Sequence, residues 1–281
     1  MDSYLGDRMK ENYENRTRFL LPRRTYTIIR LDGKAFHSLT KNCQRPFDRN
    51  FMKCMQSTAV KLCKEIQGAR FAYIQSDEIS VLLTDFEKES TEAWFDGNLQ
   101  KMCSVAASIA SVEFNKHWLT QRTESCIVCS CELLPPLSPP RCEYCIESEE
   151  DLFEWEANQN SIPGLFDARV FTIPDPIEVQ NCFVWRQQDA TRNSISMLAQ
   201  SHFSHKELHK KSTADMHEML HSKDINWNDL LIDEKHGAMV VKQEVPDLVD
   251  GVKRSRWEVV MPPVFTQQPE FLKNLIPRLI A

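Results

Sequence analysis

Hydrophobic residues near the N-terminus follow first a strand pattern and then a helix pattern. Residues 25–31 are mostly β-branched or aromatic, which predicts a strand that ends at the turn signal Asp32-Gly33. Residues 48–67 carry apolar side chains three and four positions apart, which predicts an amphipathic helix. Asp48 stands at the N-cap position of that helix. The chain therefore opens as strand, turn and helix.

A second strand pattern surrounds an acidic turn. Residues 71–83 are rich in apolar and aromatic side chains except at Ser76-Asp77-Glu78, so we expect two strands joined at that turn. Apolar residues at helical spacing follow over residues 93–118 and predict another helix. This alternation of strands and helices favours a mixed α/β fold.

The two ends of the chain carry shorter signals. A polar helix with a loose apolar face is expected over residues 1–20. In the C-terminal part, residues 168–173 predict a strand, and a helix is expected after the Trp-Arg segment at residues 185–189. A His- and Lys-rich region follows at residues 202–223, and two short strands are expected at residues 238–242 and 257–260.

Residues 120–163 differ from their surroundings because they are rich in cysteine, proline and acidic residues. We interpret them as an insertion between the first part of an α/β core, residues 1–119, and the remainder of the chain, residues 164–281. The insertion holds two C-x2-C pairs, a spacing typical of zinc bound by four thiolates. The alternative is a loop with free thiols. The candidate zinc ligands are Cys126, Cys129, Cys142 and Cys145.

The composition of the 281 residues is that of a globular protein, with 42% hydrophobic and 26% charged residues. The apolar runs are too short to span a bilayer, so we expect no membrane segment. Residues 1–10 are polar and charged, which is not the pattern of a signal peptide. We therefore expect a cytoplasmic protein, with the nucleus as an alternative in a eukaryote.

The net charge of −6 does not exclude a nucleic-acid partner, because the acidic residues are unevenly distributed. Seven of them fall within residues 143–156, a stretch without lysine or arginine. Setting these seven aside changes the charge from −6 to +1. The rest of the molecule is therefore expected to offer basic surface.

Asp32 and Asp77 are the candidate catalytic acids. If the strand before Asp32 lies beside the hairpin, the two carboxylates meet at one edge of the sheet. A divalent cation would remove their repulsion, and Mg²⁺ typically binds one or two carboxylates together with substrate phosphates. Two such ions clamp the attacking and leaving oxygens in phosphoryl transfer. On the pattern alone, both acids also fit ordinary solvated turns.

Residues close to these acids are candidate phosphate ligands. Gly33 allows a phosphate to approach the backbone closely. Lys34, Arg45 and Ser76 can donate hydrogen bonds to a triphosphate. His37 fits an ordinary turn histidine equally well.

Four segments resemble signatures of the tRNA-His guanylyltransferase family. They are Arg30-Leu31-Asp32-Gly33-Lys34-Ala35-Phe36-His37, Tyr73-Ile74-Gln75-Ser76-Asp77-Glu78-Ile79-Ser80, Phe166-Asp167-Ala168-Arg169-Val170 and Trp185-Arg186-Gln187-Gln188-Asp189. The resemblance covers most of the chain outside residues 120–163. It implies a catalytic core similar to the palm of DNA polymerases, with an antiparallel sheet and flanking helices.

The resemblance also implies an activity. Members of the family are nucleotidyltransferases that extend a tRNA at its 5′ end, from 3′ to 5′. The tRNA 5′-monophosphate is activated with ATP, or sometimes GTP. The 3′-hydroxyl of an incoming GTP then attacks the activated phosphate, and AMP leaves. The implied partners are tRNA, nucleoside triphosphates and further copies of the chain in a homotetramer.

The implied site residues follow from the matched motifs. The ligands of two Mg²⁺ ions map onto Asp32, the carbonyl of Gly33 and Asp77. Glu78 is a candidate catalytic residue, with a solvent-facing side chain as the alternative. A lysine of the family appears here as Arg45, which keeps the charge but changes the geometry. The implied nucleotide contacts are Gly33, Lys34, Ala35, Phe36, His37, Arg45, Asp48 and Ser76.

One motif departs from the family. Members specific for tRNA-His carry His-Ile-Asn-Asn where this chain has Thr191-Arg192-Asn193-Ser194. This resembles the guanylyltransferase-like branch, whose members favour templated repair of truncated tRNA 5′ ends. The alternative within the family is a strict tRNA-His enzyme that adds a single G. A non-catalytic RNA-binding protein and a nucleotide cyclase are alternatives from other classes.

Overall fold

The computed structural model describes residues 3–123, 163–246 and 253–279. Its centre is a six-stranded sheet in the order β4-β1-β3-β2-β5-β6, in which neighbouring strands are antiparallel. The strands span Tyr26–Gly33 (β1), Ala69–Gln75 (β2), Glu78–Leu83 (β3), Phe166–Ile173 (β4), Ala238–Pro246 (β5) and Lys253–Val260 (β6). This confirms the expected antiparallel sheet with flanking helices.

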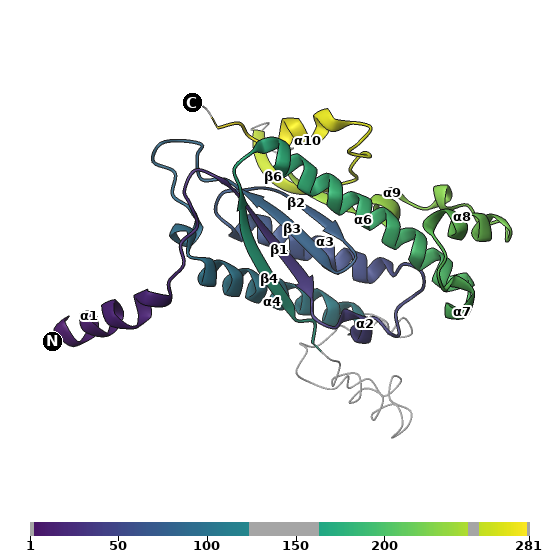
Figure 1. The fold of residues 1–281 in the computed structure, drawn as a ribbon, viewed down its shortest axis with the longest axis horizontal. Coiled ribbons are helices and arrows are strands. Elements are labelled where there is room, and N and C mark those ends of the chain that lie inside the picture. The colour runs from purple at the N-terminus through teal and green to yellow at the C-terminus, as the bar shows by residue number, and fades with distance from the viewer. Residues whose placement is uncertain (1–2, 124–162, 247–252, 280–281) are drawn as a thin grey trace, which may run out of the picture.

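Helices cover both faces of the sheet (Figure 1). Helices α3 and α4 pack on one face and α6 crosses the other. Because successive strand residues point to opposite faces, Ile29 and Leu31 of β1 pack toward α3 and α4, whereas Ile28 packs toward α6. These helices span Arg49–Glu65 (α3), Leu99–Thr123 (α4) and Pro176–His202 (α6).

The C-terminal end of α6 packs with a group of short helices that have their own core. At its centre, the indole N–H of Trp227 donates to the hydroxyl of Ser194 at 3.0 Å. Arg49 of α3 and Asp233 of α9 form an ion pair at 2.9 Å, which ties this group to the sheet domain. The group comprises α7 (His205–Leu208), α8 (Thr213–His221), η3 (Trp227–Asp229) and α9 (Ile232–His236).

The remaining short elements flank these layers. Helix α1 extends away from the body of the molecule, as Figure 1 shows. Helix α2 follows β1 directly, and its Phe36 ring is buried against the rings of Phe51, Phe114 and Phe166. This aromatic cluster fixes the loop after Asp32. The bounds are Ser3–Asn12 (α1), Glu14–Thr17 (η1), Phe36–Leu39 (α2), Trp94–Gly97 (η2) and Pro269–Leu275 (α10).

Strand β1 continues through the residues expected to turn. Asp32 lies opposite Glu78 of β3 on one side and opposite Asp167 of β4 on the other. Gly33 pairs with Phe166. The turn prediction was wrong here because neighbours on both sides extend the ladder of hydrogen bonds.

The helix expected after residues 185–189 begins well before them, at Pro176. The carboxylate of Asp175 caps it by accepting from the amide of Ile177 at 2.8 Å, and proline is favoured in the first turn. The Trp-Arg segment therefore lies inside α6. This placement turns its side chains toward the sheet, the solvent and the candidate site.

Other boundaries shift by smaller amounts. The expected helix over residues 93–118 starts at Leu99, and the helix over residues 1–20 ends at Asn12. The two C-terminal strands are longer than expected because they pair with each other along their length. Within the described ranges, no helix combines the length and apolar character needed to cross a membrane.

Candidate active site

The end of β1 and the β2–β3 turn bring acidic residues to one edge of the sheet. Asp32 lies opposite Glu78, and the amide of Gly33 donates to the carbonyl oxygen of Asp77 at 3.1 Å. Ser76 has a φ of +47°, a left-handed conformation that makes the turn tight. Asp32 and Asp77, joined by the strand pairing that their motifs predicted, line one hollow.

The charges of Asp32 and Asp77 are weakly compensated. Burial raises the pKa of the Asp77 carboxyl and the charge of Asp32 raises it further, and these effects outweigh the hydrogen bonds from the Asp77 backbone amide and the Ser76 side chain, which lower it. Arg169, whose side chain is exposed, lies 4.0 Å from Asp32 and 3.8 Å from Asp167. Such an ion pair with solvent access contributes little. Two carboxylates in this state fit a hard divalent cation such as Mg²⁺.

Glu78 faces α6 instead of solvent. Its carboxylate lies 2.9 Å from the Nε of Arg186, a side chain that is itself buried. Burial raises the pKa of the Glu78 carboxyl, and the Arg186 charge opposes that rise. Arg186 also pairs with Asp189 on its own helix. The solvent-facing alternative for Glu78 is therefore wrong, while its predicted catalytic role stays a prediction.

The hollow beside these acids lies between the β2–β3 turn and α6. Its volume is about 330 Å³. It is lined by Asp32, Gln75, Ser76, Asp77, Glu78, Arg186, Asp189, Asn193, Ser196, Met197 and Gln200. The residues around the hollow therefore come from the two sequence motifs that carry the acids and from α6.

The loop after Asp32 is shaped by packing. A Cβ at position 33 would lie 2.5 Å from the Phe36 ring, so this position requires glycine for steric reasons. The amide of Lys34 donates to the carbonyl of Leu165 at 2.7 Å, and Ala35 adopts a left-handed conformation with φ of +56°. As the first residues of a helix, Phe36 and His37 have amides without intrahelical acceptors. Lys34 and His37 are exposed.

The predicted nucleotide ligands Arg45 and Asp48 lie in the loop before α3. Arg45 is exposed. Asp48 caps α3, as its sequence position predicted, and accepts from the amides of Asn50 and Phe51 at 2.9 Å each and of Gln44 at 3.0 Å. Its observed role is structural, and its contact with a nucleotide stays a prediction.

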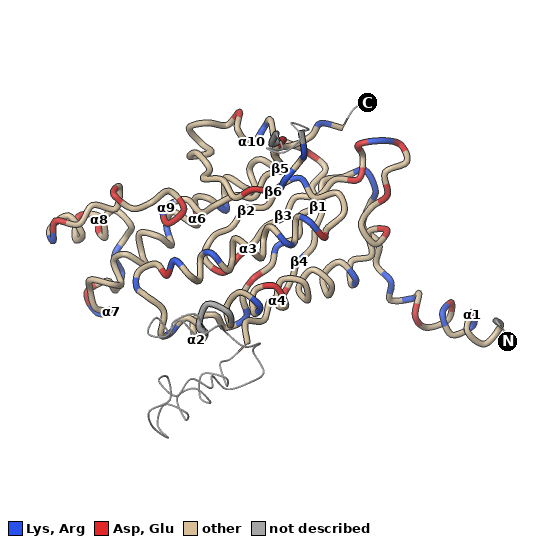
Figure 2. Tube along the Cα trace, turned by 180° about the vertical axis from the view of Figure 1, so that it is seen from behind, with Lys and Arg blue, Asp and Glu red and all other residues tan. Residues whose placement is uncertain are grey.

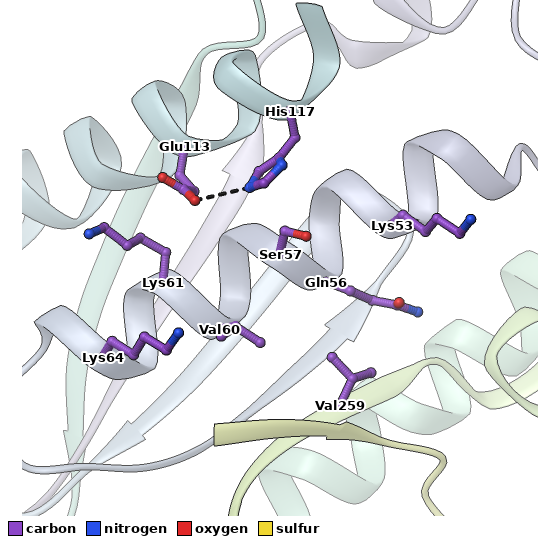
Figure 3. Close-up of a pocket in the computed structure, with 9 residues that line it drawn as sticks. All are labelled: Lys53, Gln56, Ser57, Val60, Lys61, Lys64, Glu113, His117 and Val259. Carbon is purple, nitrogen blue, oxygen red and sulfur yellow. Dashed lines mark hydrogen bonds and ion pairs between the residues drawn. The ribbon is translucent and has the colours of Figure 1, made fainter. Parts of the chain in front are cut away.

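A larger hollow, of about 470 Å³, lies beside α3, α4 and β6 (Figure 3). Lys53, Lys61 and Lys64 of α3 line it, and Figure 2 shows basic positions spaced along that helix. Across from them, the ring of His117 lies 3.0 Å from the carboxylate of Glu113. This lining offers one carboxylate, already engaged, and so lacks the donors of a divalent-metal site. We therefore place the candidate active site at the smaller hollow.

The segment that departs from the family motif has its side chains divided between two environments. The hydroxyl of Thr191 lies 3.1 Å from Nδ1 of His236, and Ser194 accepts from Trp227. These two contacts therefore attach α9 and η3 to α6. Arg192 pairs with Asp189 at 2.8 Å, and Asn193 lines the hollow. The 3.6-residue period of α6, had its start been recognised at Asp175-Pro176, would have separated these two faces.

The candidate zinc ligands Cys126, Cys129, Cys142 and Cys145 lie outside the residues that the structure describes. Within the described residues, no group of three or more His, Cys, Asp or Glu side chains is arranged to hold a metal ion. Mg²⁺ at Asp32 and Asp77 would accordingly share its coordination with substrate phosphates and water. A palm-like antiparallel sheet with two carboxylates at its edge defines the class as a nucleotidyltransferase of the polymerase-palm type.

Comparison with known proteins identifies the family within this class. The sequence profile of tRNA(His) guanylyltransferase matches residues 6–174, and the chain belongs to this family. A bacterial tRNA(His) guanylyltransferase (Thg1)-like protein, solved in complex with ATP, is 35% identical with a TM-score of 0.78, over 98% of this chain and 100% of that one. Another such structure, in complex with GTP, is 33% identical with a TM-score of 0.70, over 97% and 99% of the two chains.

A relative with a named activity is more distant. The tRNA(His) guanylyltransferase of Debaryomyces hansenii is 27% identical over 241 residues, which are 81% of this chain and 77% of that protein. The matches extend over most of the chain and include the segments that carry Asp32 and Asp77. The protein is therefore a nucleotidyltransferase of the tRNA(His) guanylyltransferase family.

Proposed function

We propose that this enzyme adds nucleotides in the 3′-to-5′ direction to the 5′ end of a tRNA. The observation that carries the proposal is the position of Asp32 and Asp77 at the ends of neighbouring strands, lining one hollow. The similarity to bacterial Thg1-like proteins bound to ATP and to GTP supports these two nucleotides as substrates.

The reaction consists of two displacements at phosphorus. First, an oxygen of the RNA 5′-monophosphate attacks the α-phosphorus of ATP, and pyrophosphate leaves. The 3′-hydroxyl of GTP then loses its proton and attacks the RNA phosphorus, and AMP leaves. Both steps build negative charge on phosphoryl oxygens, so one carboxylate site that collects cations serves both.

Asp32, the carbonyl oxygen of Gly33 and Asp77 would hold the two Mg²⁺ ions. When bound, these ions supply neutralising charge to the attacking and leaving oxygens. The weakly compensated charge of the two carboxylates supports this assignment. Glu78 forms an ion pair with Arg186, which helps to hold the turn that carries Asp77. A direct part for Glu78 in the reaction is the less supported alternative.

The loop from Gly33 to His37 would contact the triphosphate. The amides of Phe36 and His37 point out of the first turn of α2 and can donate to phosphate oxygens. Lys34 and Arg45 add positive charge, and Ser76 adds a hydroxyl next to the Asp77 carboxyl, to which its side chain is hydrogen-bonded. The side chains of Lys34 and Arg45 are exposed, which leaves their donors accessible to a ligand.

Repair of truncated tRNA 5′ ends is the form of this activity that we favour. The chain is 35% identical to a bacterial Thg1-like protein and 27% identical to the D. hansenii tRNA(His) enzyme. Its Thr191-Arg192-Asn193-Ser194 also departs from the motif of strict tRNA-His enzymes. We further propose a homotetramer, as the family resemblance implies, which light scattering of the purified protein would measure.

Transfer of label from ATP to RNA tests the activation step. The protein is incubated with a 5′-monophosphorylated tRNA and ATP labelled at the α-phosphate, without GTP. Label on the RNA supports the proposal, and a matched RNA with a 5′-hydroxyl serves as the control. No label on either RNA would favour a non-catalytic RNA-binding protein. A cyclic product formed from GTP without RNA would favour a nucleotide cyclase.

A further inference from the structure

The hollow beside Asp32 and Asp77 has a second wall, which no step of the proposed chemistry uses. Helix α6 forms this wall with side chains spaced three and four residues apart, on one helix face. They are Arg186, Asp189, Asn193, Ser196, Met197 and Gln200. Apart from Arg186 and Asp189, which form an ion pair, these side chains are uncharged, in contrast to the acidic wall across from them.

The lining offers no cation for a phosphate. Arg186 is its basic residue, and the carboxylates of Glu78 and Asp189 already bind it. Asp189 in turn is held by Arg192 at 2.8 Å. A phosphate placed against this wall would meet carboxylates without an available positive charge. The wall therefore suits a neutral, polar group.

Two side-chain amides remain available on this wall, and a third amide, that of Gln75, is buried beside it. Within the described part of the chain, the side-chain amides of Asn193 and Gln200 have no hydrogen-bond partner, and both side chains are exposed. Gln75 is 5% exposed; its amide nitrogen donates to the Glu78 carboxylate at 3.3 Å, and its amide oxygen is buried without a hydrogen-bond partner. A buried, unpaired amide oxygen costs stability unless a ligand or water satisfies it.

The size of the hollow limits its occupant. A volume of about 330 Å³ is near the lower end of small-molecule sites, which run from roughly 300 to 1,000 Å³. It can hold one sugar and base but not several nucleotides. Amides and hydroxyls are also the groups that recognise ribose hydroxyls and base edges.

We propose that the α6 wall binds the neutral nucleoside part, ribose and base, of the nucleotide whose reacting group lies at Asp32 and Asp77. This rests on the proposed function, because it assumes that an RNA 5′ end and a nucleoside triphosphate meet at those acids. The nucleoside belongs either to the 5′-terminal residue of the RNA or to the incoming GTP. Asn193 and Gln200 supply the hydrogen bonds, and Ser196 leaves the space for the ring.

Binding measurements with matched variants test this proposal. Asn193→Ala and Gln200→Ala each remove an amide, and Ser196→Leu fills the hollow. Gln188→Ala is the control, since Gln188 is an exposed amide on the same helix that does not line the hollow. Calorimetry gives the Kd for a 5′-monophosphorylated tRNA and, separately, for GTP with Mg²⁺. Circular dichroism confirms that each variant is folded.

We expect each truncation to raise one of these two Kd values about tenfold, as loss of a hydrogen bond predicts, and Ser196→Leu to raise the same one. A rise for RNA alone assigns the wall to the 5′-terminal nucleoside, and a rise for GTP alone assigns it to the incoming nucleotide. Unchanged values for both ligands would overturn the proposal. Because the readout is binding, it is independent of the label-transfer assay: a wild-type protein without activity overturns the proposed function and not this assignment.

Discussion

Arg186 in the middle of α6 forms an ion pair with Glu78 at the start of β3, with Nε 2.9 Å from Oε1. The two side chains are 7% and 14% exposed, so water screens the pair very little. The second contact of Arg186, with Asp189, helps to offset the cost of burying its charge. This pair ties the C-terminal half of the chain to the turn that carries Asp77.

Loss of Arg186 should therefore destabilise the fold more than loss of both partners. Arg186→Met leaves the Glu78 carboxylate buried and unpaired, which costs about 3–5 kcal/mol. In the double variant Glu78→Gln/Arg186→Met no charge is left unpaired, and we expect part of that loss to be recovered. Denaturant unfolding of the wild type, Glu78→Gln, Arg186→Met and the double variant measures the coupling. Costs that simply add would show that the pair is not coupled.

Asp32 and Asp77 should be required for nucleotide addition but not for folding. Asp32→Asn and Asp77→Asn keep the size of the side chain and remove the charge that Mg²⁺ needs. We expect the rate of addition to fall by at least about a thousandfold, since stabilisation worth several kcal/mol is lost. Single-turnover assays at saturating Mg²⁺ measure this rate.

Asp167→Asn is the matched control for these variants. Asp167 is an exposed acid that lies opposite Asp32 on β4 but does not line the hollow. We expect it to retain activity within a few-fold of the wild type. A folded Asp77→Asn protein as active as Asp167→Asn would exclude the assignment of Asp77.

The sequence predicts this edge of the sheet well because its signals are local. Runs of apolar and aromatic residues on both sides of Ser76-Asp77-Glu78 predict the hairpin, and the hairpin brings Asp77 beside the strand that ends near Asp32. The ion pair of Glu78 with Arg186 was not predictable in this way. It joins residues far apart in sequence, and its geometry depends on how α6 crosses the sheet.

Gly33→Ala should destabilise the loop that follows Asp32. The added Cβ would lie 2.5 Å from the buried Phe36 ring, and overpacking of this kind typically costs about 1–3 kcal/mol. Gly6→Ala is the control, because a Cβ at position 6 meets nothing within 4 Å. Thermal unfolding should show a lower midpoint for Gly33→Ala and an unchanged or higher one for Gly6→Ala. Equal midpoints would contradict the packing argument.

His236 should make stability dependent on pH. Burial, together with the charge of Lys235, lowers the pKa of His236 below its ordinary value of 6.5. The unfolded chain therefore binds this proton at higher pH than the folded chain does. The stabilisation that the folded state gains from neutral His236 is fully present above about pH 6.5 and is lost as the pH falls through the lower pKa of the folded state.

Replacement of His236 tests this dependence. Unfolding free energies measured from pH 7.5 to pH 5 should fall for the wild type and change less for His236→Gln. His205→Gln, at an exposed histidine of α7, is the control. Parallel curves for all three proteins would show that His236 is not the source of the pH dependence.

The contacts of the Thr191–Ser194 segment were not predictable from the sequence. In the structure the hydroxyl of Thr191 lies 3.1 Å from Nδ1 of His236. Ser194 likewise packs on Trp227, in a part of the chain whose helices have only weak local signals. The periodicity of a helix separates such faces only when its start is known. Here Asp175-Pro176 was the signal that marks it.

The direction and template dependence of addition test the central claim most directly. The protein is incubated with a 5′-monophosphorylated tRNA that lacks its first nucleotide, together with ATP and labelled GTP. We predict a product one nucleotide longer, with the label at its 5′ end, for tRNAs of several identities. Changing the opposing C to another base should change the nucleotide that is added. Extension at the 3′ end, or no extension, would contradict the account, and addition of G alone to tRNA-His alone would favour the strict enzyme.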